Sequence, residues 1–124
     1  MKQHAHLTCD ALIVRCIDFR FIQYIRDFTD TELAGKTYDI IGFAGSTKEW
    51  DKVMEEVDIS ERLHEFKQLV LINHEDCGAY GDEDTPEHHA ADLRRAREVA
   101  LAKYPQLQVD MYYLHLDGTF ERVS

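Results

Sequence analysis

The chain has 124 residues, of which 44% are apolar, and we interpret residues 1–124 as one domain with a single hydrophobic core. Its 24 acidic and 14 basic residues give a net charge of −10 with no basic tract, so we expect neither a nucleic-acid partner nor binding to an anionic membrane surface. No apolar run approaches the ~20 residues of a membrane helix, and the first residues lack the apolar stretch of a signal peptide, so we expect a cytoplasmic location.

The hydrophobic pattern alternates along the chain between short β-branched runs and apolar residues at helical spacing. A capping box at Ser46 and Glu49 predicts the start of the second helix, and Ser60 predicts the start of a separate helical segment. Thr85 followed by Pro86 is typical of a helix start. We expect strands at residues 12–16, 38–43, 69–73 and 109–116, a short antiparallel return strand at 119–123, helices at 21–28, 50–57 and 86–104, and a glycine-rich loop at 78–83.

Strands that alternate with helices are typical of βαβ units. They predict an α/β fold with a mostly parallel sheet of four to five strands flanked by helices. Right-handed crossovers place helices on both faces of such a sheet. Ligands bind beyond the carboxyl ends of its strands, so the residues that directly follow the strands are the first candidates for chemistry.

Two of these strand ends carry metal-ligating side chains. Cys16 ends the first strand, and His74 and Cys77 follow the third. Thiolate sulfur and imidazole nitrogen are ligands that Zn²⁺ accepts in tetrahedral geometry, and three protein ligands leave one position open. In a reducing compartment, cysteines near histidine and aspartate more often indicate metal binding or catalysis than disulfides. The sequence therefore predicts a zinc site formed by Cys16, His74 and Cys77.

Asp18 and Arg20 follow the first strand two residues apart, and alternation along an extended chain points both side chains the same way. An arginine fork can hold a carboxylate through two hydrogen bonds. Beside the predicted ligands, we interpret the pair as functional, with Arg20 orienting Asp18 toward a water on the zinc. The alternative is a surface ion pair worth under ~1 kcal/mol.

The motif C-x-D-x-R at residues 16–20, followed by H-x-x-C-G at residues 74–78, resembles the zinc signature of the β-class carbonic anhydrases. The similarity spans residues 11–123. It includes the apolar strand before the histidine and the YLHLDG stretch at residues 113–118, which is similar to the closing strand and turn of that family.

This resemblance implies a β-carbonic-anhydrase-like fold and a zinc lyase that hydrates CO₂ reversibly to bicarbonate by a zinc-bound hydroxide. By position, it implies that Cys16, His74 and Cys77 bind Zn²⁺ and that Asp18 and Arg20 form the catalytic dyad. It also implies a homodimer with its sites near the subunit interface. In some members of the family the aspartate releases the arginine and closes the fourth zinc position, and Asp18 is placed to do the same.

The chain departs from the family pattern after the second strand, where an Arg-Asn-Ala-Gly stretch is replaced by GFAG at residues 42–45. Two alternative functions follow. One is a hydrolase of COS or CS₂, because a zinc hydroxide can attack any small linear heterocumulene. The other is a catalytically silent zinc-binding or regulatory module, which the missing Arg-Asn pair favours. Phe19, Phe43 and Tyr80 are candidate walls of the substrate pocket, and an ordinary core or surface position is the simpler interpretation of each.

Other histidines allow further interpretations. His4, His6 and Cys9 could bind a second metal, although chain termini are usually mobile and a free or buried Cys9 thiol is the simpler interpretation. His88 and His89 open the third helix and could carry protons away from the zinc site. A solvated helix start is the simpler interpretation of these two residues.

Two thiolate ligands would cancel the formal charge of Zn²⁺, so we expect its bound water to have a pKa above the value of about 7 found with three histidine ligands. We therefore predict that CO₂ hydration, measured by stopped-flow at several pH values, rises above neutral pH. A flat profile from about pH 6 to about pH 9 would contradict this prediction.

Overall fold

The computed structural model describes residues 5–124 and contains one five-stranded sheet in the order β2-β1-β3-β4-β5. All neighbouring strands are parallel except β5, which is antiparallel to β4, and this confirms the predicted α/β class. Among the described residues, no helix is long and apolar enough to cross a membrane. The elements are β1 (Ala11–Arg15), α1 (Ile22–Glu32), β2 (Tyr38–Gly42), α2 (Trp50–His64), β3 (Gln68–His74), α3 (Pro86–Lys103), β4 (Gln108–Leu114) and β5 (Phe120–Val123), with two short 3₁₀ helices at Phe19–Phe21 and Gly78–Glu83.

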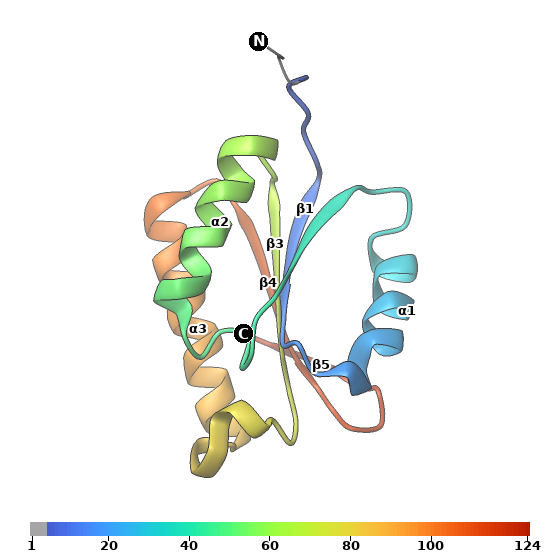
Figure 1. Cartoon of the computed structure of the whole chain (residues 1–124), viewed down its shortest axis with the longest axis vertical. Coiled ribbons are helices and arrows are strands. Elements are labelled where there is room, and N and C mark those ends of the chain that lie inside the picture. The colour runs from blue at the N-terminus through green and yellow to red at the C-terminus, as the bar shows by residue number, and fades with distance from the viewer. Residues whose placement is uncertain (1–4) are drawn as a thin grey trace.

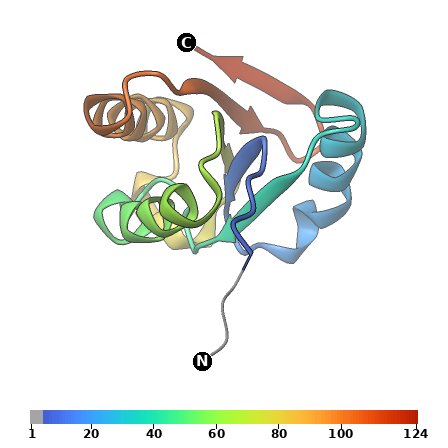
Figure 2. The same cartoon turned by 90° about the horizontal axis from the view of Figure 1, so that it is seen from above.

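Helices cover both faces of the sheet. Figures 1 and 2 show α2 and α3 together on one face and α1 on the other. The central strands β1 and β3 are therefore buried on both faces. This burial explains why they read as continuous apolar runs rather than as alternating patterns.

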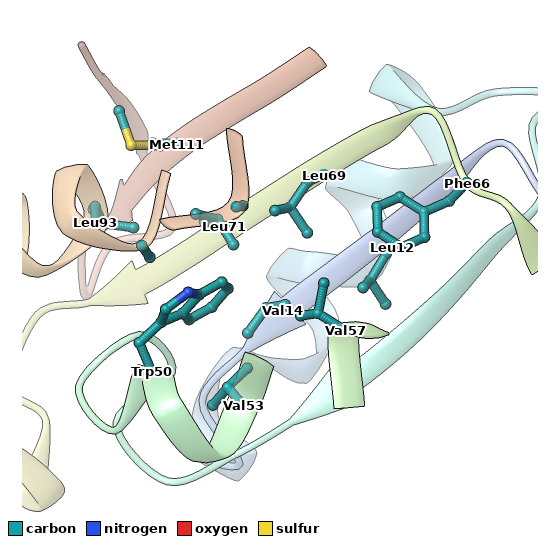
Figure 3. Packing of buried hydrophobic residues seen from close by; sticks show 12 residues of the cluster. Leu12, Val14, Trp50, Val53, Val57, Phe66, Leu69, Leu71, Leu93 and Met111 are labelled. Atoms are coloured by element: carbon teal, nitrogen blue, oxygen red, sulfur yellow. The ribbon is translucent and has the colours of Figure 1, made fainter. Parts of the chain in front are cut away.

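The larger hydrophobic core lies between the sheet and the pair α2 and α3. In Figure 3 the α2 side chains Trp50, Val53 and Val57 point toward the side chains of the strands. Helix α3 adds Leu93 and two buried alanines, whose small side chains let the helix lie close to the sheet. A second cluster, which includes Phe21, fills the space between the sheet and α1.

The start of α2 differs from the prediction. Ser46 and Glu49 do not form a capping box, because the helix begins at Trp50 and Ser46 lies in a preceding turn. Ser46 has a φ of +54° and follows Gly45, whose φ is +82°. An N-cap residue normally has an extended backbone, so a left-handed Ser46 cannot serve as one.

The predicted break at Ser60 is also wrong, because α2 runs without interruption to His64. Ser60 is buried, and its hydroxyl donates to Asp39 Oδ2 on β2 over 2.7 Å instead of capping a helix. Residues 78–83, expected as a loop, form a 3₁₀ helix that is kinked at Gly81. Helix α3 begins as predicted, since Thr85 accepts a hydrogen bond from the His88 backbone N–H.

Candidate metal centre

Cys16, His74 and Cys77 come together at the carboxyl ends of two neighbouring strands. Cys16 directly follows β1, His74 is the last residue of β3, and Cys77 follows a tight turn. Because β1 and β3 are parallel, with Arg15 opposite Ile72, the two strand ends meet at the same edge of the sheet. One ligand atom from each of the three residues lies within 4.8 Å of the others, and all three residues are buried.

The two sulfur atoms, Cys16 Sγ and Cys77 Sγ, lie 4.0 Å apart. Two sulfurs bound to one tetrahedral zinc at ~2.3 Å lie about 3.8 Å apart, so the spacing fits a shared ion. The backbone N–H of Gly45 donates to Cys16 Sγ over 3.3 Å. The hydrogen bond between the two sulfurs lowers the pKa of Cys16 and raises the pKa of Cys77.

The ring of His74 is oriented by its own loop. Its Nδ1 lies 2.7 Å from the backbone oxygen of Glu75, which assigns the proton to Nδ1, and the Phe21 ring packs against it with centroids 4.3 Å apart. Nε2 then carries the lone pair, is buried and has no hydrogen-bond partner among residues 5–124. Metal-ligating histidines typically donate their other ring N–H to such a carbonyl. The ring therefore presents Nε2 as a ligand atom.

Asp18 and Arg20 contact each other beside this cluster, although not through strand alternation, because β1 already ends at Arg15. Asp18 instead caps the 3₁₀ helix at Phe19–Phe21, where its Oδ1 accepts the Arg20 backbone N–H over 2.9 Å. The Arg20 guanidinium donates to both carboxylate oxygens, with Nη2 2.7 Å from Oδ2. These hydrogen bonds hold the pKa of Asp18 at about 2, so the carboxylate is ionised near neutral pH.

A second partner of Arg20, Asp76, was not indicated by the sequence. Arg20 Nη1 donates to Asp76 Oδ2 over 3.0 Å, and Nη2 donates to the Asp76 backbone oxygen over 2.8 Å. Asp76 has a left-handed backbone with a φ of +59°. Arg20 thus holds Asp18 at the edge of the cluster, with Asp18 Oδ2 3.8 Å from His74 Nε2.

A hollow of about 370 Å³ opens onto this cluster. Of the three predicted pocket walls, Phe19 lines it, whereas Phe43 packs against the larger core and Tyr80 is buried in a polar network. A larger hollow, of about 510 Å³, lies between α1 and β5 and has no cysteine or histidine among its lining residues. The smaller hollow is lined by Cys16, Ile17, Asp18, Phe19, Arg20, Ala44, Cys77, Gly78 and Ala79.

A buried polar network supports the loop that carries Cys77. Asp84 Oδ2 accepts the Cys77 backbone N–H over 3.0 Å, and Asp84 Oδ1 lies 2.8 Å from His89 Nε2. Burial lowers the pKa of His89, which favours a neutral ring. Nε2–H then donates to Asp84, and Nδ1 accepts from Asn73 Nδ2 over 2.9 Å. Because His89 is buried and both its nitrogens are engaged, it forms neither a solvated helix start nor an exposed proton carrier.

Asn73 connects the network to the rest of the site. Its Oδ1 accepts from the Thr47 hydroxyl over 2.9 Å, and its Nδ2 also donates to the Tyr80 hydroxyl over 2.9 Å. The Tyr80 hydroxyl in turn donates to Asp92 of α3. The turn before α2, strand β3, the Cys77 loop and α3 are therefore joined around the cluster. In the sequence, the one feature that could have indicated this network is Asn73, a polar residue near the end of the buried strand β3.

The second predicted metal set is not formed as expected. His4 lies outside the described residues, and His6 Nε2 instead contacts Glu65 Oε1 over 2.6 Å. Cys9 is half-buried and lies beside two residues that the sequence did not connect with it, Asp39 and His64.

A Cys₂His cluster at the carboxyl edge of a parallel sheet, with an Asp–Arg pair beside it, defines a candidate zinc-type centre in an α/β protein. Residues 7–124 match the family described as "Putative carbonic anhydrase", and the chain belongs to this family. It is 31% identical over 131 residues to an uncharacterized protein of Rickettsia conorii, covering 90% of this chain and 70% of that one. It is 28% identical to an uncharacterized protein of Rickettsia bellii, covering 98% and 87%.

Solved carbonic anhydrases share this fold at low sequence identity. The enzyme of Streptococcus mutans has a TM-score of 0.65 at 20% identity, over 98% of this chain and 88% of that chain. The β-carbonic anhydrase isoform I of Trichomonas vaginalis has a TM-score of 0.63 at 17% identity, over 99% and 86%. A tetrameric β-carbonic anhydrase of Sordaria macrospora has a TM-score of 0.62 at 11% identity, over 95% and 82%. The β-carbonic-anhydrase-like fold expected from the resemblance is therefore confirmed.

The neighbouring residues His88 and His89 provide a matched test of the buried network. His89→Ala removes one buried hydrogen-bond partner from Asp84 and one from Asn73 and opens a cavity, so we expect the free energy of unfolding to fall by about 2–4 kcal/mol. His88→Ala alters an exposed side chain and should change the free energy of unfolding by less than about 0.5 kcal/mol. Urea unfolding of both variants measures the difference, and equal small losses would refute a stabilising role for the network.

Proposed function

We propose that this protein is a zinc-dependent carbonic anhydrase that catalyses the reversible hydration of CO₂ to bicarbonate. Membership of the family supports the proposal. The observation that carries it is the grouping, within 4.8 Å of one another, of two sulfur atoms and one ring nitrogen that has no hydrogen-bond partner in the described part of the chain, beside an ionised carboxylate. This donor set is one that Zn²⁺ accepts while keeping a position open.

In this proposal Cys16, His74 and Cys77 hold the metal. When bound, zinc supplies a nucleophile near neutral pH by lowering the pKa of water. The Gly45 N–H stabilises the Cys16 thiolate, and the Glu75 carbonyl fixes the tautomer in which His74 Nε2 is free to bind.

Asp18 is the proposed catalytic carboxylate and Arg20 the residue that positions it. Because the pKa of Asp18 is about 2, its oxygens can only accept hydrogen bonds at working pH. Arg20 fixes their direction, and Asp76 fixes Arg20. An acceptor held in this way orients the O–H of a reacting water, so that the oxygen lone pair faces the substrate.

The hollow beside the cluster suits a small apolar substrate. Ile17, Phe19 and Ala79 line it together with Cys16 and Cys77. CO₂ is linear and nonpolar, so it needs little more than an apolar wall next to the nucleophile. The same lining suits COS or CS₂, and hydrolysis of these molecules is the second candidate function.

The position of Asp18 favours catalysis over a catalytically silent zinc module. In the silent alternative, Asp18 would leave Arg20 and occupy the open metal position. Here both carboxylate oxygens accept hydrogen bonds from Arg20, which is itself held by Asp76. Closing the site would break these charge-assisted bonds.

Stopped-flow CO₂ hydration with zinc-loaded protein tests the proposal. Cys16→Ser should lose both zinc and activity. Asp18→Asn should keep zinc while its kcat falls by about 10²–10⁴-fold, because the uncharged amide is a much weaker acceptor for the reacting water than the carboxylate. Asp82→Asn removes an exposed carboxylate from the neighbouring turn and should leave the zinc content and kcat unchanged.

Full zinc occupancy without CO₂ hydration at any pH would reject the carbonic anhydrase proposal. Activity on COS or CS₂ in the same preparation would then support the hydrolase. Silence on all three substrates, with a pH-independent spectrum of the cobalt-substituted protein, would support the closed module, because a bound water makes such a spectrum pH-dependent.

We also propose that the active form contains a homodimer built through the edge strand β2. Five exposed apolar residues at this edge, which we name the β2-edge patch, are Ile17, Phe19, Ile22, Tyr38 and Ile40. Phe19 is 79% exposed, and within residues 5–124 strand β2 pairs with β1 alone, so one side of its backbone has no partner strand in that part of the chain. Ile17 and Phe19 also line the hollow, so a second copy seated on the patch would complete its wall.

Sedimentation velocity of the wild-type chain should give a dimer or a multiple of it. Ile40→Glu places a charge in the patch and should yield monomers. Val99→Glu, which alters an exposed apolar residue on α3, is the matched control and should leave the assembly unchanged. A wild-type chain that sediments as a monomer at all concentrations tested would reject the dimer.

A further inference from the structure

We propose that Cys9, Asp39 and His64 form a second metal site for a zinc-type cation, at the opposite end of the sheet from the Cys16 cluster. One sulfur, one carboxylate oxygen and one ring nitrogen from these residues lie within 4.8 Å of one another. Ligand atoms around one tetrahedral zinc lie about 3–4 Å apart, so small side-chain adjustments close the set.

Three separate elements position these ligands. Cys9 precedes β1, Asp39 lies in β2 and His64 is the last residue of α2. In Figure 1 the start of β1 and the end of α2 both lie in the upper half of the molecule, whereas the carboxyl end of β1 lies in the lower half. The two clusters are therefore separated by the length of strand β1.

Backbone hydrogen bonds fix Cys9 beside the other two residues. The Cys9 N–H donates to the backbone oxygen of His64 over 3.0 Å. The next residue, Asp10, donates its N–H to the Thr37 backbone oxygen and accepts the Thr37 N–H through its carboxylate over 2.9 Å. The backbone at Cys9 and Asp10 is thus held by the folded chain, and the Cys9 thiol donates to the Ala11 backbone oxygen over 3.4 Å. Little ordering entropy is therefore lost when a cation binds.

The donor set is one that zinc-type cations select. Thiolate, imidazole and carboxylate are the three ligand types of protein zinc sites, and here they occur once each. Cys9 and Asp39 together would supply two negative charges, which matches the charge of the cation. Without metal, His64 Nδ1 lies 2.6 Å from Asp39 Oδ2, so a cation would replace or join an existing contact. The thiol proton passes to solvent on binding.

A further hydrogen bond orients the carboxylate. Ser60, buried on α2, donates its hydroxyl to Asp39 Oδ2 over 2.7 Å. Partners of this kind fix the direction of a ligating carboxylate, and their loss typically weakens metal binding by about 10–100-fold. Ser60 thus contacts the proposed site directly and caps no helix.

Metal content measured after zinc loading and desalting tests the proposal. The wild-type chain should retain about two zinc ions, and Cys9→Ser and Cys16→Ser should each retain about one. His64→Gln should lose the same ion as Cys9→Ser. Ser60→Ala should lower the affinity for that ion by about 10–100-fold in a chelator competition. His88→Gln, which alters an exposed histidine on α3, should retain both ions.

Each outcome separates this proposal from the carbonic anhydrase proposal. If Cys9→Ser and wild-type chains bind the same number of ions with the same affinities, the second site does not exist. Equal losses in His88→Gln would identify adventitious binding by surface histidines and would also reject it. If Cys16→Ser loses no metal while Cys9→Ser does, the second site stands and the proposed zinc enzyme fails.

Cobalt loading provides a readout that does not depend on stability. Thiolate bound to cobalt gives charge-transfer absorption, so this absorption in the double variant Cys16→Ser, Cys77→Ser would report on Cys9 alone, the one cysteine that remains. It should disappear when His64→Gln is added to this double variant. Absorption that is absent from the folded double variant, or that His64→Gln leaves unchanged, would overturn the proposal.

Discussion

The parallel pairing of β1 with β3 is the constraint on which the candidate metal centre depends. It brings Cys16 beside His74, although the two residues are far apart in the sequence. A slip of one residue would move Cys16 by about 3.3 Å and turn its side chain to the other face of the sheet. Helices pack on both faces of these strands, so hydrophobic burial on each side resists such a slip. The site therefore depends on the core for its geometry.

Backbone strain in this chain is concentrated next to its ligand clusters. Among the described residues, those other than glycine with a left-handed backbone are Ser46, Glu65 and Asp76. Ser46 follows the Gly45 amide that contacts Cys16, Asp76 precedes Cys77, and Glu65 follows His64. Each such residue costs roughly 1–2 kcal/mol, and such costs persist only where surrounding contacts impose them. Near Cys77 these contacts include the Asp84–His89–Asn73 network.

Features set by local pattern were predictable from the sequence. The apolar runs identified the strands, and the positions after them identified Cys16, His74 and Cys77 as neighbours in space. The pairing of Asp18 with Arg20 was also expected, although a 3₁₀ turn rather than an extended strand produces it. The helix starts were less predictable, because serine is a common N-cap residue, yet neither Ser46 nor Ser60 caps a helix in this chain.

What the sequence did not indicate is the set of contacts between distant segments. Ser60 contacts β2, His89 lies in a buried network, and Cys9 meets His64 instead of His6, because tertiary packing decides each of these. The periodicity of the local sequence does not indicate that a histidine at a helix start faces inward. The same holds for the contact between Arg20 and Asp76, which depends on how two loops approach each other.

The two edges of the sheet are chemically unlike. At one edge β2 exposes Tyr38 and Ile40, whereas at the other the short antiparallel strand β5 carries Glu121 and Arg122, and Arg122 is paired with Asp110. Short, charged edge strands resist the addition of another strand. Growth by strand addition is therefore possible in one direction only, and two copies joined at β2 would leave only β5 edges outside. Strand β5 thus ends the sheet at one edge, so that pairing through β2 gives a closed dimer rather than a filament.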